Sequence, residues 1–196
     1  MKAFHGQPDI KAQYLARVKA HEAADEIIHG KYWEDGKGCA VGCTIHSSNH
    51  GNYETELGIP RILARLEDGI FEGMTNGHSQ AWPGEFLQAI RVGADLSMVW
   101  PRFAIWLLGD KKEGVIRFAK TDVQRKAIID VVKAYKQVVK TGRYEKAVDW
   151  WQLRAAAYAA YAADAAAAFL WVRNYPWALI YAGAALIQTG CLWATR

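Results

Sequence analysis

Apolar residues recur three and four positions apart along most of this chain, and this spacing limits the possible folds more than any other feature. No segment shows the alternation of apolar and polar residues that is typical of a strand. A first helix is predicted over 9–30, with an apolar stripe formed by Ile10, Tyr14, Val18 and Ile28. The sequence therefore predicts an all-α fold: a single helical domain with a Gly-rich loop after the first helix and an Ala-rich helical region at its C-terminal end.

Three prolines mark where further helices are expected to begin. The segment "IPRILARLEDGIFEGM" predicts a helix opened by Pro60, "WPGEFLQAI" a helix beginning near Pro83, and "LSMVWPRFAIWLLG" a buried helix starting at Pro101. In the first of these, Glu67 lies near the edge of the apolar stripe, while Asp68 and Glu72 lie outside it. We expect Asp68 and Glu72 to face solvent, which argues against a pair of acid–base carboxylates on this helix.

A long amphipathic helix is expected after Thr121 and Asp122, which are its possible caps, and Gly142 is expected to end it. Its predicted inward residues are Val123, Ala127, Val131, Tyr135 and Val138. The region from Lys111 to Lys146 holds eleven basic and four acidic residues, so an anionic partner, including a nucleic acid, is a possible ligand of this surface. A solvated helix surface explains the same charges.

The composition changes near residue 150, and we divide the chain there into a helical domain, 1–150, and Ala-rich and apolar helices, 151–196. The apolar segment 177–195 is only marginally long enough to span a bilayer, and it contains Gln188 and two glycines. We expect it to pack on the first domain or to form a homo-oligomer rather than to enter a membrane.

The chain has three cysteines, an odd number that does not make a disulfide framework. The first residues contain no apolar run that could serve as the core of a signal peptide. Both observations predict a cytoplasmic protein.

The segment "GKGCAVGCTIH", which begins at Gly36, and the residues after it contain four possible metal ligands in the spacing C-x3-C-x2-H-x3-H. They are Cys39, Cys43, His46 and His50. Zinc sites usually separate two ligand pairs by about a dozen residues, and a helix would spread these four over roughly 16 Å. Only neighbouring members could then share an ion, and we predict no metal site from this spacing. Further ligands would have to come from elsewhere in the chain, such as His21, Asp25 or His29.

Cys39 is also a candidate nucleophile. A helix beginning there would lower the pKa of the thiol through its N-terminal amides and the nearby Lys37. His21 is then the candidate general base, and Asp25, one helical turn further on, the carboxylate that orients it. A purely structural hydrogen bond between His21 and Asp25 explains the same pair.

The same loop can bind an anion through its backbone. Its glycines allow N–H groups to turn toward one anion, and Lys37 supplies positive charge, although the spacing does not match a P-loop. The predicted ligand-binding residues are Gly36, Lys37, Gly38, Cys39 and His46.

The stretches "WEDGKGCAVGCTIH", "YETELGIPRILARLEDGIFEGM" and "WPGEFLQAI" resemble a family of proteins found in bacteria and their phages, over about residues 1–108. Many members also carry an Ala-rich helical tail, as "AAAYAAYAADAAAA" does here, but they tend to close with a charged helix rather than an apolar one. The family has no established activity, so the resemblance supplies no functional residues. The association with phages implies a role against host defence.

These observations favour binding over catalysis. We expect an intracellular protein that captures an anionic, nucleotide-like ligand as a phage anti-defence or signalling module, and the sequence identifies no cofactor. Two alternatives stay open. One is a cysteine-dependent enzyme that uses Cys39 with His21 and Asp25, and the other is an interaction module that inhibits a host defence protein without a small-molecule ligand.

Overall fold

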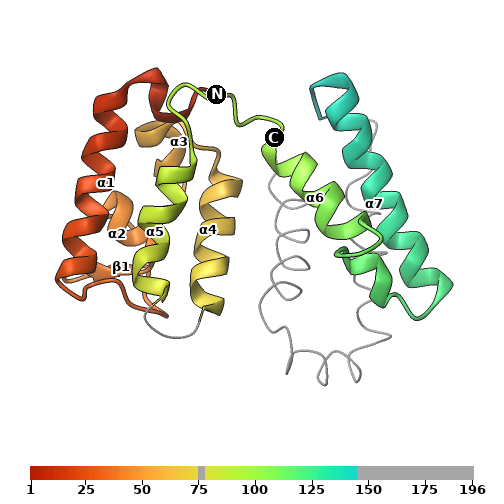
Figure 1. Cartoon of the computed structure of the whole chain (residues 1–196), viewed down its shortest axis with the longest axis horizontal. Helices are drawn as coiled ribbons and strands as arrows, with labels where there is room; N and C mark the ends of the chain where they lie inside the picture. The colour runs from red at the N-terminus through yellow and green to blue at the C-terminus, as the bar shows by residue number, and fades with distance from the viewer. Residues whose placement is uncertain (75–77, 145–196) are drawn as a thin grey trace. The chain divides into compact units, whose positions relative to one another are not determined.

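The computed structural model describes residues 1–74 and 78–144 (Figure 1). Most of these residues are helical, and their one sheet has two short strands, so the all-α prediction is confirmed. The chain divides into two compact units, Met1–Ser97 and Met98–Arg196. The boundary predicted at residue 150 and the helices predicted after it lie outside the described residues.

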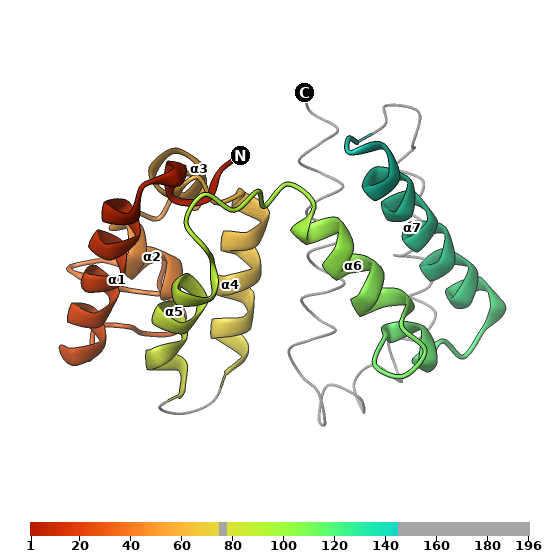
Figure 2. The same cartoon turned by 45° about the horizontal axis from the view of Figure 1, so that its top comes forward.

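The first unit is built around one short buried helix, α2. Its elements are η1 (Ala3–Gly6), α1 (Pro8–Ala23), β1 (Trp33–Glu34), β2 (Lys37–Gly38), α2 (Ala40–Ile45), α3 (Asn52–Leu57), α4 (Arg61–Gly73) and α5 (His78–Ala89). Figures 1 and 2 both show α5 between α1 and α4. Because α2 packs against all three of these helices, each of its six residues is buried.

The Gly-rich stretch forms an antiparallel hairpin, which the sequence did not predict. Trp33 pairs with Gly38 and Glu34 with Lys37. The hairpin lies directly against α2, because an added Cβ at Gly42 would come within 1.6 Å of the Tyr32 carbonyl oxygen. The glycines at 38 and 42 are thus required for close packing of the backbone.

Helix α1 is shorter than predicted, because it ends at Ala23 rather than near Gly30. Asp25 adopts a left-handed conformation with φ 54°, and the chain then turns back toward the hairpin. There the Ile28 N–H donates to the Gly38 carbonyl at 2.8 Å, and the Gly38 N–H donates to the Glu26 carbonyl at 3.1 Å. These backbone hydrogen bonds replace the last helical turns.

Two proline predictions also shift. Helix α5 begins at His78 and contains Pro83, and α6 begins at Val99, so that Pro101 lies in its first turn. Pro60 is the N-cap of α4, which agrees with the prediction that it opens this helix.

In the second unit, α6 (Val99–Gly109) leads through η2 (Val115–Phe118) to α7 (Asp122–Thr141), which packs on α6 in the opposite direction (Figures 1 and 2). Thr121 and Gln124 form a capping box, and Gly142 ends α7 in a left-handed conformation, as predicted. The predicted inward face is confirmed for Ala127, Val131, Tyr135 and Val138, but it is wrong for Val123, which is 66% exposed.

Within the described residues, no helix combines the length and the apolar character needed to cross a membrane. The apolar segment 177–195 lies outside that part of the chain.

Candidate functional site

Two neighbouring carboxyl groups of α4 lie in the interior of the first unit. Glu67 has no exposed surface and Asp68 is 9% exposed, so the prediction that Asp68 faces solvent is wrong. The reason is that the segment between α1 and α3, which includes the hairpin and α2, covers this side of α4. Glu72, one turn further along, accepts hydrogen bonds from the Gly30 N–H at 3.0 and 3.1 Å, which holds the loop against the helix.

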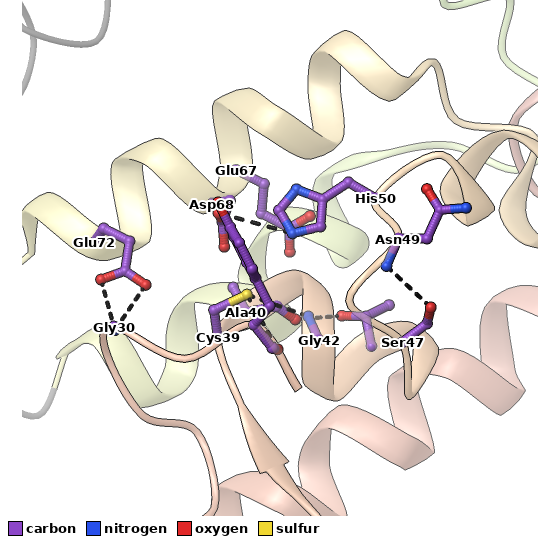
Figure 3. A network of polar contacts seen from close by, with 12 residues as sticks. Gly30, Cys39, Ala40, Gly42, Ser47, Asn49, His50, Glu67, Asp68 and Glu72 are labelled. Carbon is purple, nitrogen blue, oxygen red and sulfur yellow. Dashed lines mark hydrogen bonds and ion pairs between the residues drawn. The ribbon is translucent and has the colours of Figure 1, made fainter. Parts of the chain in front are cut away.

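Cys39, His50 and Asp68 converge on one point (Figure 3). One donor atom from each residue lies within 4.8 Å of the donor atoms of the other two. Cys39 is the N-cap of α2, His50 lies in the loop before α3, and Asp68 lies on α4. Three separate segments of the chain therefore bring a thiol, an imidazole and a carboxylate together.

Several polar atoms around this point are buried and have no hydrogen-bond partner within the described part of the chain. They are His50 Nε2 and Asp68 Oδ1, together with the Glu67 carboxyl oxygens and the Tyr53 hydroxyl, which interact with each other without reaching hydrogen-bond geometry. A buried polar atom without a partner costs about 1–3 kcal/mol, and native proteins leave few of them. Such a concentration at one place indicates that a further group belongs there.

Burial favours the uncharged form of each ionisable group in this cluster. It raises the pKa of the Cys39 thiol far above its usual range, and the nearby Asp68 carboxylate adds to this effect. Burial raises the pKa of Asp68 to about 6 and that of Glu67 well above its ordinary value. It also lowers the pKa of His50 to about 4, assisted by the charges of Arg65 and Arg61. A bound cation would reverse this preference and favour the thiolate and the carboxylate.

The arrangement differs from that of a thiol nucleophile with a histidine base. His50 Nε2 lies 3.9 Å from Asp68 Oδ2. In a catalytic triad the imidazole lies between the nucleophile and the carboxylate, with one ring nitrogen toward each. Here the three donor atoms form a triangle, the thiol donates to the Tyr32 carbonyl at 3.6 Å, and Cys39 has no exposed surface. This geometry suits a shared ion better than proton transfer.

The predicted group of Cys39, His21 and Asp25 does not assemble among the described residues. His21 binds Glu26 through Nδ1 at 2.6 Å and His46 through Nε2 at 2.7 Å. Asp25 is exposed, and its carboxylate accepts from the Gln80 side chain. Because α1 ends before Asp25, the helical spacing that suggested a His–Asp pair does not apply.

The residues predicted to bind an anion are spread over the hairpin and α2. Gly36 and Lys37 are exposed. The N–H of Gly38 is used by Glu26 and the N–H of Cys39 by the Lys31 carbonyl, so both donors are occupied within the fold. His46 ends α2 in a left-handed conformation and stacks on Trp33, with ring centroids 4.6 Å apart.

Of the four residues in the C-x3-C-x2-H-x3-H pattern, the structure brings only the first and the last together. Cys43 is buried on a different side of α2, where its thiol donates to the Gly38 carbonyl at 3.3 Å, and burial raises its pKa to about 12. Asp68 and Glu67 are the members of the site that the sequence reasoning missed. The only feature of the sequence that pointed to them was a pair of neighbouring carboxylates beside the apolar stripe of α4.

Comparisons with protein families, with curated proteins and with solved structures give no match to this chain.

Proposed function

We propose that this protein binds one divalent metal ion of the zinc type through Cys39 Sγ, one imidazole nitrogen of His50 and one carboxylate oxygen of Asp68. The observation that carries the proposal is the convergence of these three donor atoms within 4.8 Å, inside a cluster of buried polar atoms that lack partners. This assignment replaces the prediction of no metal site, which rested on sequence spacing alone.

The ligand types and their separation both favour zinc. Zinc binds Cys sulfur, His nitrogen and Asp oxygen at about 2.0–2.3 Å in tetrahedral geometry, so neighbouring ligand atoms around the ion are roughly 3.3–3.7 Å apart. The separation of 3.9 Å between His50 Nε2 and Asp68 Oδ2 is close to that range. A soft thiolate disfavours Mg²⁺ and Ca²⁺, which prefer oxygen ligands.

Three protein ligands leave the fourth position of a tetrahedral ion open. A water molecule could occupy it, and Glu67, the neighbour of Asp68 on α4, has two buried carboxyl oxygens without hydrogen-bond partners in the described part of the chain. A hydrogen bond from that water to Glu67 would satisfy a group that is otherwise costly to bury. Glu67 is thus assigned the role of a positioning residue next to the ion.

The test is metal binding by the full chain and by a matched pair of cysteine variants. Purified protein is stripped with a chelator, loaded with Zn²⁺ or Co²⁺, and assayed for metal content and for the thiolate-to-cobalt charge-transfer band. We expect one ion per chain in the natural sequence. We expect Cys39→Ser to lose the charge-transfer band and to weaken binding by more than about a hundredfold, since even loss of an outer-shell contact costs 10–100-fold.

Cys43→Ser is the control, because Cys43 is also a buried, free cysteine on the same turn of chain but lies outside the cluster. It should bind the ion as the natural sequence does. His46→Gln and His50→Gln form a second pair, in which only the His50 variant should lose metal. Stoichiometric binding that survives Cys39→Ser, or no binding by the natural sequence, would contradict the proposal.

The earlier hypotheses of nucleotide capture, anti-defence activity and cysteine-dependent catalysis stay predictions. Binding of a nucleic acid by the basic surface also stays a prediction. The basic residues of α7 on this surface are all exposed: Arg125, Lys126, Lys133, Lys136 and Lys140. Iodoacetamide labelling of the metal-free protein separates the catalytic alternative from metal binding. A reactive Cys39 thiol at neutral pH supports catalysis, because the metal proposal expects the buried thiol to react slowly.

A further inference from the structure

Two arginines lie on the side of α4 that faces the metal ligands. Arg61, Arg65, Asp68 and Glu72 follow one another four, three and four residues apart, which places them on one stripe of the helix. On this stripe, Asp68 lies beside His50 in the loop before α3, and Glu72 accepts from the Gly30 N–H in the loop after α1. The positive charges of Arg65 and Arg61 also contribute to the lowered pKa of His50, after the effect of burial.

Within the described residues, neither guanidinium forms an ion pair. In residues 1–74 and 78–144, no carboxylate lies within ion-pair distance of Arg61 or Arg65. The nearest acidic contact of Arg61 goes to its backbone, because the Glu54 carboxylate accepts from the Arg61 N–H at 2.9 Å. The Arg61 Nε is buried and has no hydrogen-bond partner. A buried donor on a charged group is costly to leave unpaired, so an acceptor is expected there.

Bound metal would not remove this excess of positive charge. A divalent ion is balanced by the Cys39 thiolate and the Asp68 carboxylate, and the two arginines then leave two positive charges. The Glu54 carboxylate, which accepts from the Arg61 N–H, offsets one of them, so one positive charge remains while Glu67 stays protonated. The local charge therefore favours an anion, and the open coordination position lets that anion bind the ion directly.

The anion must have enough oxygens to reach the ion and two guanidinium groups together. A carboxylate has two oxygens, whereas a phosphate has at least three that are free in a monoester. Planar guanidinium groups form strong paired hydrogen bonds with phosphate oxygens. A phosphate group thus matches the number of donors, and it carries the negative charge that the excess of positive charge favours.

We propose that Arg61, Arg65 and the open position of the metal form a binding site for a phosphate group, as free phosphate or as a phosphate monoester. This inference rests on the metal site proposed above. Tyr32, whose ring meets the edge of the His50 ring with centroids 5.0 Å apart, borders the same side of the cluster. Tyr32 is 61% exposed, so solvent reaches the side chain that packs against the His50 ring.

The test uses the full chain loaded with Co²⁺ and inorganic phosphate as the probe. The cobalt content is measured first, and the visible absorption bands of the ion are then followed during a phosphate titration. We expect a saturable change in these bands. Arg61→Gln and Arg65→Gln should each keep the cobalt content and raise the phosphate dissociation constant about ten- to a hundredfold, as expected for loss of a hydrogen bond to a charged group.

Arg91→Gln is the matched control, because Arg91 is an exposed arginine of the same unit far along the chain from α4. It should bind both cobalt and phosphate as the natural sequence does. Acetate should change the bands only at much higher concentration. A parallel titration with phenyl phosphate gives the dissociation constant of a monoester, and the lower of the two dissociation constants shows whether the site prefers a monoester or free phosphate.

Two results would overturn the inference. If the chain binds cobalt but phosphate leaves its spectrum unchanged, or if both arginine variants bind phosphate like the natural sequence, then the arginines do not form the site and the metal proposal stands. If the chain binds no cobalt, the metal proposal fails, and the phosphate site fails with it.

Discussion

Gly42 is the position where the fold leaves least room for a side chain. A Cβ at this residue would lie 1.6 Å from the Tyr32 carbonyl oxygen and 2.8 Å from the carbonyl carbon. Both atoms belong to the backbone of the hairpin, which is also bonded to α2 through the N–H of Cys39. The contact cannot be relieved by rotating a side chain, so the hairpin must move away from α2.

We expect Gly42→Ala to lower the free energy of unfolding by at least about 3 kcal/mol, because overpacking against backbone forces the hairpin apart. Gly84→Ala is the control, since Gly84 lies within α5 and an added Cβ meets nothing within 4 Å. That change should raise stability by about 0.5–1 kcal/mol, as alanine favours a helix over glycine. Urea unfolding followed by circular dichroism measures both. Equal stabilities of the two variants would contradict the proposed packing.

At the residue level, sequence reasoning identified part of the site. Cys39 and His50 were recognised as potential ligands, but helical spacing suggested that they are too far apart to meet. They meet because α2 ends at Ile45 and the chain then reverses, which a regular helix cannot do. Asp68 was placed on the solvent side because an apolar stripe does not reveal which polar face a distant loop will cover.

Among the helices, α1 and α2 are joined by a pair of histidines. His21 on α1 bonds His46, the C-cap of α2, and both rings contact Trp33 of the hairpin. Only one proton can lie between two imidazole nitrogens 2.7 Å apart, so the pair cannot accept a second positive charge without weakening this junction.

We expect this junction to make stability depend on pH. Burial is the largest cause that lowers the pKa of His46, and the charges of Arg17 on α1 and of His21 lower it further. The charges of Glu56 and Glu26 raise it and so oppose the change. Unfolded histidine takes up a proton near pH 6.5, and folded His46 does so only at lower pH. The unfolded state then binds more protons, so stability is full above about pH 6.5 and falls as the pH drops through the folded pKa.

Urea unfolding at several pH values checks this prediction. His46→Asn keeps a residue that tolerates the left-handed conformation but removes the titrating ring. The variant should lose less stability than the natural sequence between about pH 7 and pH 5. The same loss in both proteins would show that other groups cause the pH dependence.

Element prediction succeeded where local chemistry decides the structure and failed where tertiary contacts do. The cap at Thr121, the stop at Gly142 and the start of α4 after Pro60 depend on neighbouring residues, and all three were predicted, although the role of Gln124 in the capping box was not. The early end of α1 and the short helix α2 depend on backbone hydrogen bonds to the hairpin and on burial by three other helices. The spacing of apolar residues within those segments does not reveal these tertiary contacts.

For the whole molecule, the two units should respond differently to metal. The three proposed ligands all lie in the first unit, Met1–Ser97. We expect Zn²⁺ at about a hundred times its dissociation constant to stabilise that unit by roughly 2.7 kcal/mol. Hydrogen-exchange mass spectrometry, which follows each part of the chain separately, should show increased protection in peptides from residues 1–74 and little change in peptides from 98–144. The effect should vanish in Cys39→Ser, and protection gained only in the second unit would contradict the site.

The closeness of Cys39, His50 and Asp68 along the chain has a further consequence, for how such a site can form. Closing a loop costs entropy that grows with the logarithm of its length, and the two loops between these ligands are short. The entropy lost on closing either loop is therefore smaller than that lost on forming the contacts between α1 and α5, which lie much further apart along the chain.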